Sequence, residues 1–396
     1  MPYEVDVLKK LLKLNTDATS KLNYREAAEL IASMLEELGV DAEVVGEKVP
    51  SVVAKLDSGC DKDIAVVSHY DVVPAEGPWR INGLEVDPFE PVEVDGKVYG
   101  RGAADNKSGI AATLGAIREL RGVELRYNPV VVVVGDEEVG GIGMREVLSL
   151  GYKFDGAVIL DALADYVEIG ATGVVHGWIR VYGKGGHAGY PHLCENPIWG
   201  LAELVAELKR FSAERASKAS DVPAPPESPV PYVWGRFSIT MLRAGSKHNV
   251  IPDVAEAAFD LRVIPGENVD EAIRELVSYF NYARVKHGLR GEIQIDYETI
   301  NTGWLTDRRH QLVSEACSAA RAAYRAVYSE EGDKLFKGVA AGLGADDGYC
   351  FSNKGIPTVG FGAIRRENNI HGANEFVYVK DIILVREFLK TLFKST

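Results

Sequence analysis

The sequence predicts a mixed α/β fold, in which a mostly parallel sheet is flanked by helices and carries an inserted α+β domain. Unbroken apolar runs such as Val130–Val134 are typical of strands buried on both faces, as in a parallel sheet. Segments with helical spacing alternate with these runs, which favours βαβ units. Between residues 174 and 298, apolar and polar residues alternate along the strands instead, which indicates an antiparallel sheet with one covered face. A chain of 396 residues is long enough for two domains.

We therefore expect residues 1–173 and 299–396 to form one main domain, with residues 174–298 inserted into it. In the first part, helical spacing predicts helices over 5–14 and 24–38, and Gly39 is a good stop for the second. Short strands are expected over 42–45, 51–56 and 64–68. A long loop with a short hairpin over 74–100 precedes a helix that ends near Leu120. The valine run, a helix over 144–150 and a strand over 157–160 complete a βαβαβ pattern.

The insert is predicted to follow the order βαββαβ, which is the ferredoxin-like plan. Its strands are expected over 174–182, 232–243, 255–263 and 292–297, and its helices over 196–211 and 269–286. The segment 213–231 is polar and contains five prolines, so we expect a surface excursion there. The α/β pattern then resumes with a helix over 311–328, a strand near Thr358 and a closing helix over 382–393.

Composition narrows the classes of function. The formal net charge of −14 argues against nucleic acid and anionic membrane surfaces as partners. It does not exclude an anionic substrate, because a local arginine or metal ion outweighs the global sign. The four cysteines are scattered, so neither a disulfide framework nor a thiolate zinc site is expected. The sequence shows neither a signal peptide nor an apolar stretch of membrane-spanning length, and we expect a cytoplasmic protein.

Ligand-type residues stand directly after several buried runs. His69 and Asp71 follow the strand 64–68, Asp161 follows 157–160, and Asp136, Glu137 and Glu138 follow the valine run. Ligands bind at the carboxyl ends of strands in open α/β sheets, so we expect these side chains to gather at one edge. Three carboxylates at the end of a buried strand are costly unless a cation offsets their charge.

Two more candidates complete a metal-binding set. Asp105 lies just ahead of a helix N-terminus, which favours anionic groups, and His371 follows the strand near Thr358. Imidazole and carboxylate ligands without thiolates suit zinc, with cobalt as a substitute. The set exceeds the needs of one ion, so we expect two metals roughly 3.5–4 Å apart.

Each piece alone also has an ordinary explanation. A His-x-Asp pair at a strand end is more often structural, and adjacent glutamates are usually solvated. The loop Gly100–Asp105 resembles a nucleotide-binding turn, but it lacks the third glycine of that fingerprint. The complete set favours the metal site over these readings.

Six motifs stand in order along the chain. They are Ser68–Pro74 (SHYDVVP), Gly100–Lys107 (GRGAADNK), Asp136–Glu138 (DEE), Gly183–Pro191 (GKGGHAGYP), His248–Pro252 (HNVIP) and His371–Glu375 (HGANE). With these motifs the sequence resembles a family, the di-zinc amidohydrolases that include acetylornithine deacetylase, succinyl-diaminopimelate desuccinylase, aminoacylase and related carboxypeptidases and dipeptidases. The resemblance covers nearly the whole chain. Together these motifs are specific for the family and say little about the substrate.

The resemblance implies a zinc-peptidase-like main domain and a role for each strand-end residue. One zinc ion is expected on His69, Asp105 and Asp161. The other is expected on Asp105, Glu138 and His371, so that Asp105 bridges the two. Asp71 is expected to orient His69, the usual task of a residue behind a metal ligand. Glu137 is expected to be the general base for the attacking water.

The resemblance also assigns residues of the insert, which it implies to be a lid and dimerisation domain. His187 is expected to stabilise the oxyanion in the active site of a partner subunit, which predicts a homodimer. Asn249 and Arg262 are expected to bind the substrate, although Arg262 is equally well explained as one half of a salt bridge on a strand face. Arg365 lies in a loop that departs from the family pattern. It is either a further contact to the substrate carboxylate or a solvated loop charge.

The implied activity is hydrolysis of the amide bond of N-acyl amino acids, small molecules with a free carboxylate. A dipeptidase or carboxypeptidase is the alternative within the family. A non-catalytic, metal-stabilised assembly protein that uses the proline-rich stretch 221–231 as a contact is the alternative from another class. Such a protein has no use for Glu137, which favours an enzyme.

Overall fold

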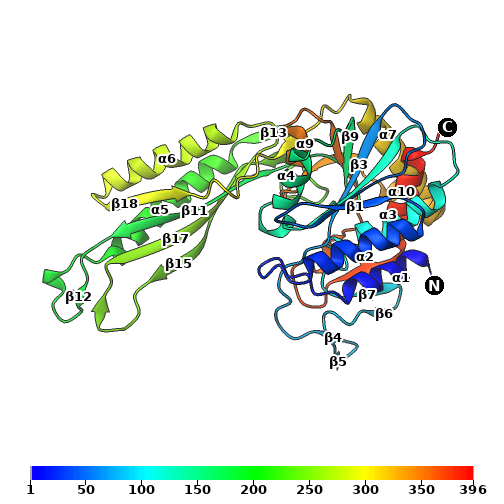
Figure 1. Cartoon of the computed structure of the whole chain (residues 1–396). Helices are drawn as coiled ribbons and strands as arrows, with labels where there is room; N and C mark the ends of the chain where they lie inside the picture. The colour runs from blue at the N-terminus through cyan, green and yellow to red at the C-terminus, as the bar shows by residue number, and fades with distance from the viewer. Residues whose placement is uncertain (1, 396) are drawn as a thin grey trace. The chain divides into compact units, whose positions relative to one another are not determined.

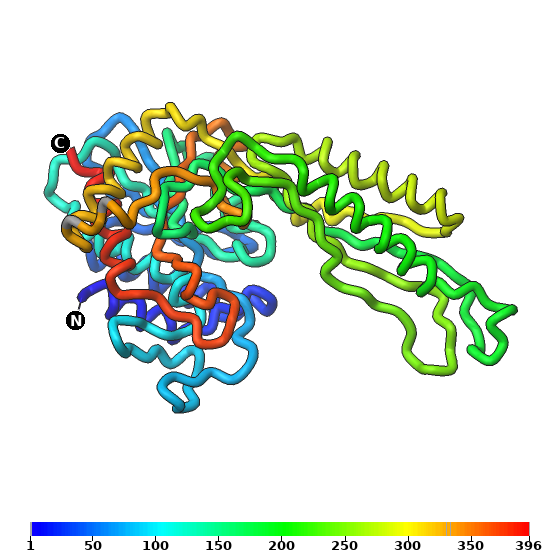
Figure 2. Tube along the Cα trace, turned by 180° about the vertical axis from the view of Figure 1, so that it is seen from behind, coloured from blue at the N-terminus to red at the C-terminus, as the bar shows by residue number. Residues whose placement is uncertain are grey.

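The computed structural model describes residues 2–395 and divides into two compact units (Figure 1). The main unit comprises Met1–Gly170, Leu305–Gly342 and Asp346–Thr396. The inserted unit comprises Ala171–Trp304 with Leu343–Ala345. Both ends of the chain lie in the main unit (Figure 2).

A mixed sheet forms the centre of the main unit. Its spatial order is β1 (Ala42–Val45), β2 (Ser51–Lys55), β8 (Asn128–Val134), β3 (Asp63–His69), β9 (Gly156–Ile159), β21 (Thr358–Gly360), β10 (Val167–Ala171) and β19 (Trp304–Leu305), with β20 (Val339–Gly342) also paired to β10. The pairs β8–β3, β3–β9 and β9–β21 are parallel. The pairs β1–β2, β2–β8 and β10–β21 are antiparallel. The predicted mixed sheet with a parallel centre is therefore confirmed.

Helices surround this sheet. They are α1 (Tyr3–Leu12), α2 (Tyr24–Glu37), α3 (Lys107–Leu120), α4 (Ile142–Ser149), α7 (Gln311–Tyr328), α8 (Gly332–Leu335), α9 (Gly348–Ser352) and α10 (Val379–Phe393). Helix α3 packs against α1 and α10, and α10 packs against α7. The predicted loop 74–100 contains the hairpins β4 (Arg80–Ile81) with β5 (Leu84–Glu85), and β6 (Val92–Val94) with β7 (Lys97–Tyr99). Strand β22 (Phe376–Tyr378) joins β7.

The inserted unit has the βαββαβ order that the sequence predicts. Its antiparallel sheet runs β15 (Arg236–Ala244), β17 (Val254–Val263), β11 (Gly173–Tyr182) and β18 (Arg290–Ile295). Helices α5 (Pro197–Ala216) and α6 (Val269–Lys286) lie side by side along the sheet (Figures 1 and 2). Leu204 and Leu208 of α5 and Leu276 and Phe280 of α6 share one core with Phe259 of β17.

Short elements extend the inserted unit. Strand β12 (Gly186–His187) pairs with β16 (Val250–Ile251), and β13 (Ala219–Pro223) pairs with β14 (Tyr232–Trp234). The predicted surface excursion therefore contains a hairpin, and α5 extends five residues past its expected end at Phe211. Among the helices of residues 2–395, none is long and apolar enough to cross a membrane.

Candidate metal centre

The carboxyl ends of three neighbouring parallel strands bring the first candidate ligands together. His69 is the last residue of β3, and Glu137 and Glu138 form a short turn after β8. Asp161 follows β9. Because β3 lies between β8 and β9 in parallel register, these side chains converge above the same edge of the sheet.

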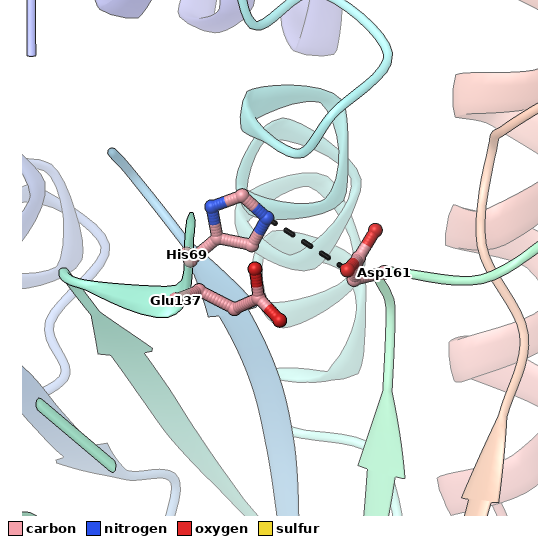
Figure 3. Close-up of side chains that lie close together, drawn as sticks. All are labelled: His69, Glu137 and Asp161. Carbon is pink, nitrogen blue, oxygen red and sulfur yellow. Dashed lines mark ion pairs between the residues drawn. The ribbon is translucent and has the colours of Figure 1, made fainter. Parts of the chain in front are cut away.

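The first group consists of His69, Glu137 and Asp161 (Figure 3). One ligand atom from each lies within 4.8 Å of the others. Nε2 of His69 is 3.9 Å from Oδ2 of Asp161, the pair that the dashed line marks. The carboxylate of Glu137 extends from the turn after β8 into the space beside this pair.

The second group consists of Asp105, Glu138 and His371, again with ligand atoms within 4.8 Å of one another. Nε2 of His371 lies 3.1 Å from Oδ2 of Asp105 and 3.2 Å from Oε2 of Glu138. The other oxygen of Asp105, Oδ1, lies 3.0 Å from Nε2 of His69. Asp105 thus directs one carboxylate oxygen at a histidine of each group.

Crowding of acids shifts the pKa values of the site. Burial, aided by neighbouring carboxylates, raises the pKa of Glu137, Glu138 and Asp161 above the usual range. Burial also opposes the charge of Asp105, but hydrogen bonds from His371 and His69 outweigh it and lower the pKa of that carboxyl. Hydrogen bonds to Asp105 and Glu138 raise the pKa of His371 to about 10. The neighbouring carboxylates therefore stabilise the positively charged forms of His69 and His371.

The donor set fits divalent metal ions. Imidazole nitrogen and carboxylate oxygen, without thiolate, are ligands that zinc and cobalt accept. A bound cation would take the place of the protons that the carboxylates otherwise impose on the histidines. The two groups, joined by Asp105, therefore fit two ions.

Asp71 connects the two strand ends. Nδ1 of His69 lies 3.1 Å from the backbone carbonyl oxygen of Asp71 and 3.4 Å from its carboxylate. Either contact leaves Nε2 of His69 directed at Asp105. The same carboxylate accepts hydrogen bonds from the backbone N–H groups of Glu137, at 3.3 Å, and Glu138, at 3.1 Å. Asp71 therefore holds the Glu137–Glu138 turn as well as the histidine.

Asp136, the third carboxylate after β8, is offset without a metal. It is buried, accepts a hydrogen bond from the Tyr24 hydroxyl at 2.9 Å and forms an ion pair with Lys21. Lys21 and Tyr24 therefore offset the free-energy cost of burying the charge of Asp136. The cation expected to offset this strand-end charge is thus Lys21 in the case of Asp136.

A buried ion pair between Arg101 and Glu375 was not predicted as part of the site. Nη1 of Arg101 lies 2.7 Å from Oε2 of Glu375, and both side chains are buried. Glu375 also accepts hydrogen bonds from the backbone N–H groups of Gly102, Ala104 and Asp105. Nη2 of Arg101 donates to the carbonyl oxygen of His371 at 3.2 Å. This pair therefore ties the loop of Asp105 to the loop of His371. Both residues lie within motifs already visible in the sequence, Gly100–Lys107 and His371–Glu375, which was the available signal.

His187 and Asn249 lie together in the inserted unit. His187 is on β12, paired to Val250 of β16, and the N–H of Ala188 donates to the carbonyl oxygen of Asn249 at 3.0 Å. Both side chains are exposed. Nδ1 of His187 accepts a hydrogen bond from the N–H of Gly189 at 2.9 Å, which leaves Nε2 as the donor.

The two candidate arginines have carboxylate partners. Arg262 holds Asp260 with two hydrogen bonds, of 2.9 and 3.0 Å. Arg365 binds both oxygens of Asp381, at 3.0 and 2.8 Å, and forms an ion pair with Asp165. The side chain of Arg365 is only 15% exposed, so it is not a solvated loop charge. Because its guanidinium already has two carboxylate partners, it is also not free to bind a substrate carboxylate. Its guanidinium braces the main unit instead.

An α/β sheet that gathers nitrogen and carboxylate ligands at its parallel strand ends is an arrangement suited to metal-dependent hydrolysis. Residues 65–395 match the family described as Peptidase family M20/M25/M40, and the chain belongs to this family of metallohydrolases.

Individual relatives differ in their named activities. A succinyl-diaminopimelate desuccinylase of Wolbachia pipientis is 26% identical over 93% of this chain and 89% of its own. The crystal structure of an M20 family metallo-carboxypeptidase from Sulfolobus solfataricus has a TM-score of 0.81 at 20% identity and covers 99% of this chain and 98% of its own. A di-peptidase from Saccharomyces cerevisiae has a TM-score of 0.78 at 17% identity, with coverages of 99% and 95%. These structures share the fold.

Proposed function

We propose that the protein is a di-metal amidohydrolase that cleaves the amide bond of N-acyl amino acids with a free carboxylate. The observation that carries this proposal is that Asp105 contacts a histidine of each group, while the first group also contains Glu137 beside His69 and Asp161. A purely structural metal site uses all its ligands for the metal. Glu137 adds a carboxylate that the two ions do not require.

Zinc is the proposed metal, with cobalt as a substitute. His69, Asp105 and Asp161 would hold one ion, and Asp105, Glu138 and His371 the other. Such ions polarise the substrate carbonyl and lower the pKa of bound water when they are present.

Glu137 is proposed as the general base. Its carboxylate lies beside His69 and Asp161, whereas the next residue, Glu138, faces His371. Glu137 would accept the proton of the attacking water and then donate it to the nitrogen of the leaving amine. Asp71 keeps the two glutamates apart in these roles by holding both backbone N–H groups.

Asn249 and Arg262 are the proposed contacts to the substrate. Arg262 would have to exchange part of its bond to Asp260 for the substrate carboxylate. Asp260 also contacts Nε2 of His176 at 3.1 Å, so it would keep a partner during this exchange. Arg365 is left out of this proposal because Asp381 and Asp165 occupy its guanidinium.

A dipeptidase or carboxypeptidase is the second candidate. The likeness to the named metallo-carboxypeptidase and di-peptidase supports it at the level of the fold. Cleavage of a peptide bond would use the same residues, since a dipeptide is an N-acyl amino acid whose acyl group carries an amine. The non-catalytic alternative has no support, because the family is one of hydrolases.

A homodimer through the inserted unit is also proposed, with His187 acting in the partner's active site. Strand β15 is an edge of the sheet, and an exposed edge is a ready pairing surface. Large apolar side chains are exposed on the same unit, including Trp199 at 71%, Leu242 at 63% and Leu193 at 60%. A second copy of the chain would cover such a surface. A cytoplasmic location remains a prediction from the sequence.

Hydrolysis assays with zinc- or cobalt-loaded protein test the activity. The panel contains N-acetyl and N-succinyl amino acids, dipeptides, and the same compounds with the carboxylate converted to an amide. We expect cleavage of the free acids and much weaker cleavage of the amides. Replacement of Arg262 by alanine should raise KM for the acids roughly 10-fold or more, the effect of a lost charged hydrogen bond, and leave the amides nearly unchanged. Equal effects on acids and amides would return Arg262 to a purely structural role.

A further inference from the structure

Three buried carboxylates lie beyond the candidate ligands and have no place in the proposed mechanism. Glu168 is on β10, and Asp346 and Asp347 directly precede α9. Each is at most 5% exposed. Glu168 and Asp346 interact electrostatically with each other, and both interact with Asp161 of the first ligand group. The acidic surroundings of the centre therefore extend well past the residues that would hold metal.

Asp347 is the member of this set that lies near Glu137, the proposed base. It interacts electrostatically with Glu137, His69 and Asp71. Its Oδ1 lies against Gly141, where an added Cβ would come within 2.7 Å, so the turn that carries Glu137 passes directly over this carboxylate. Its other oxygen, Oδ2, is buried and has no hydrogen-bond partner among the residues that the structure describes. A carboxylate oxygen left in this way costs free energy unless a ligand or water pairs with it.

The other acids are better supported. Glu168 accepts a hydrogen bond from the Tyr166 hydroxyl at 3.2 Å, and Asp346 accepts one from the N–H of Gly348 at 2.6 Å. A cation near Asp347 is Arg145, whose Nη1 donates to the Tyr349 hydroxyl at 2.8 Å. Arg145 offsets part of the charge of Asp347 without binding its free oxygen.

The balance of charge between the carboxylates and two metal ions indicates which kind of group Oδ2 of Asp347 attracts. Asp105, Glu137, Glu138 and Asp161 carry four negative charges when ionised, which two divalent ions would balance. Asp347 adds to that balance, and Asp346 lies close enough to add further negative charge when it is ionised. The surroundings of Asp347 are therefore suited to a cationic group and repel an anionic one.

We propose that Asp347 binds the α-ammonium group of the substrate's acyl half, so that the substrate is a dipeptide-like N-aminoacyl amino acid. This inference rests on the proposed amide hydrolysis and decides between its two candidate substrate classes. The free carboxylate belongs to the leaving half, and Asp347 would repel that half. The group next to Asp347 must then lie on the acyl side of the scissile bond, and the nearest cation there is an α-ammonium.

Glycyl-leucine and propionyl-leucine form a matched pair of probes. They share the leucine leaving group and the same number of heavy atoms, and they differ in an ammonium group against a methyl group. Metal-loaded wild-type protein should cleave glycyl-leucine with a kcat/KM about tenfold or more above that for propionyl-leucine, the size of a charged hydrogen bond. Asp347→Asn should remove most of this preference by slowing glycyl-leucine, with propionyl-leucine within about threefold of wild type.

Two controls separate binding of the ammonium from other effects. Asp307→Asn removes an acidic charge from an exposed site of the main unit and should leave the preference intact. Metal content and the unfolding midpoint of Asp347→Asn show whether the site is assembled. If that variant does not fold, Asp347→Glu replaces it, and a displaced carboxylate should weaken the preference without reversing it.

The outcomes are distinct. A wild-type enzyme that cleaves both probes equally, or prefers propionyl-leucine, overturns the inference and leaves the amidohydrolase proposal standing. Equal slowing of both probes by Asp347→Asn would also overturn it, since Asp347 would then act through Glu137 or the fold. A third contrary result is that wild-type protein cleaves propionyl-lysine faster than propionyl-leucine and loses that difference in Asp347→Asn. Asp347 would then bind an ammonium group in the leaving half, which would contradict the assignment to the acyl side. Failure to cleave any amide of the panel would sink the proposed function itself.

Discussion

Asp71 and Glu138 are joined by a hydrogen bond in which Oδ2 of the aspartate accepts from the backbone N–H of the glutamate at 3.1 Å. The same carboxylate accepts from the N–H of Glu137 and lies 3.4 Å from Nδ1 of His69. One side chain thus aligns a candidate ligand from each group with the candidate base. Because Asp71 contacts His69 and the backbone of Glu138, it orients these candidate metal ligands.

Asp71→Asn should therefore weaken metal binding by about 10–100-fold, the range typical of partners behind metal ligands. An amide presents an NH₂ group to one of the two backbone N–H donors, so one hydrogen bond must be lost. Titration of apo protein with zinc against a competing chelator measures this. Asp57→Asn is the control, because Asp57 accepts a hydrogen bond from Gly59 in an exposed loop. Unchanged affinity in Asp71→Asn would remove Asp71 from the site.

Glu375 supports a second prediction. Glu375→Ala leaves the guanidinium of Arg101 buried and unpaired, which typically costs about 3–5 kcal/mol. It also frees three backbone N–H groups in the loop of Asp105. We expect a much lower unfolding midpoint and weaker zinc binding, with partial rescue by Glu375→Gln. Asp307→Asn, which breaks the exposed pair with Arg309, should barely change the midpoint. A midpoint for Glu375→Ala equal to that of this control would contradict the role given to the pair.

The gathering of the candidate ligands at one edge of the sheet could be predicted because their positions depend on local sequence. A buried apolar run that ends in His69 or Asp161 predicts both the strand and the edge at which the side chain emerges. The helices Gln311–Tyr328 and Val269–Lys286 begin and end as their periodicity indicates. These signals need no knowledge of distant partners.

The partners of charged residues could not be predicted in this way. Arg365 was an open candidate because its sequence neighbours do not reveal that Asp165 and Asp381 meet it in the fold. Lys21 meets Asp136, which lies 115 positions further along the chain, and Arg101 meets Glu375, which lies 274 positions further along. Such pairs are set by tertiary packing, which a single sequence does not display.

Glu137 supports a third prediction. Glu137→Gln should keep both metals and the fold but lower kcat about 10²–10⁴-fold, because the water loses its proton acceptor. Steady-state kinetics with the preferred amide, together with metal analysis of the same sample, measures both effects. Glu146→Gln is a matched control, since Glu146 belongs to the same unit, lies outside both ligand groups and accepts hydrogen bonds from the backbone N–H groups of Glu47 and Val49. Near wild-type turnover in Glu137→Gln would rule out its role as the base.

His187 supports a fourth prediction, which concerns assembly. If His187 acts in the partner's site, homodimers of Glu137→Ala or of His187→Ala should each be nearly inactive. A mixed dimer contains one site that lacks both residues and one site that has both. After random subunit exchange about half of the dimers are mixed, so about a quarter of wild-type activity should return.

Activity after verified exchange therefore decides whether His187 acts between subunits. If His187 acted within its own chain, every site of a mixed dimer would lack either Glu137 or His187, and no activity would return. A chain that stays monomeric at assay concentration would contradict the dimer itself.

Metal stoichiometry tests the central claim most directly. Pure protein, stripped with a chelator, reconstituted with zinc and freed of excess metal, should contain two ions per chain. Asp161→Ala should contain one, because it removes a ligand from the first group and leaves Asp105, Glu138 and His371 in place. A wild-type stoichiometry of one or none, or two ions retained in Asp161→Ala, would contradict the di-metal account.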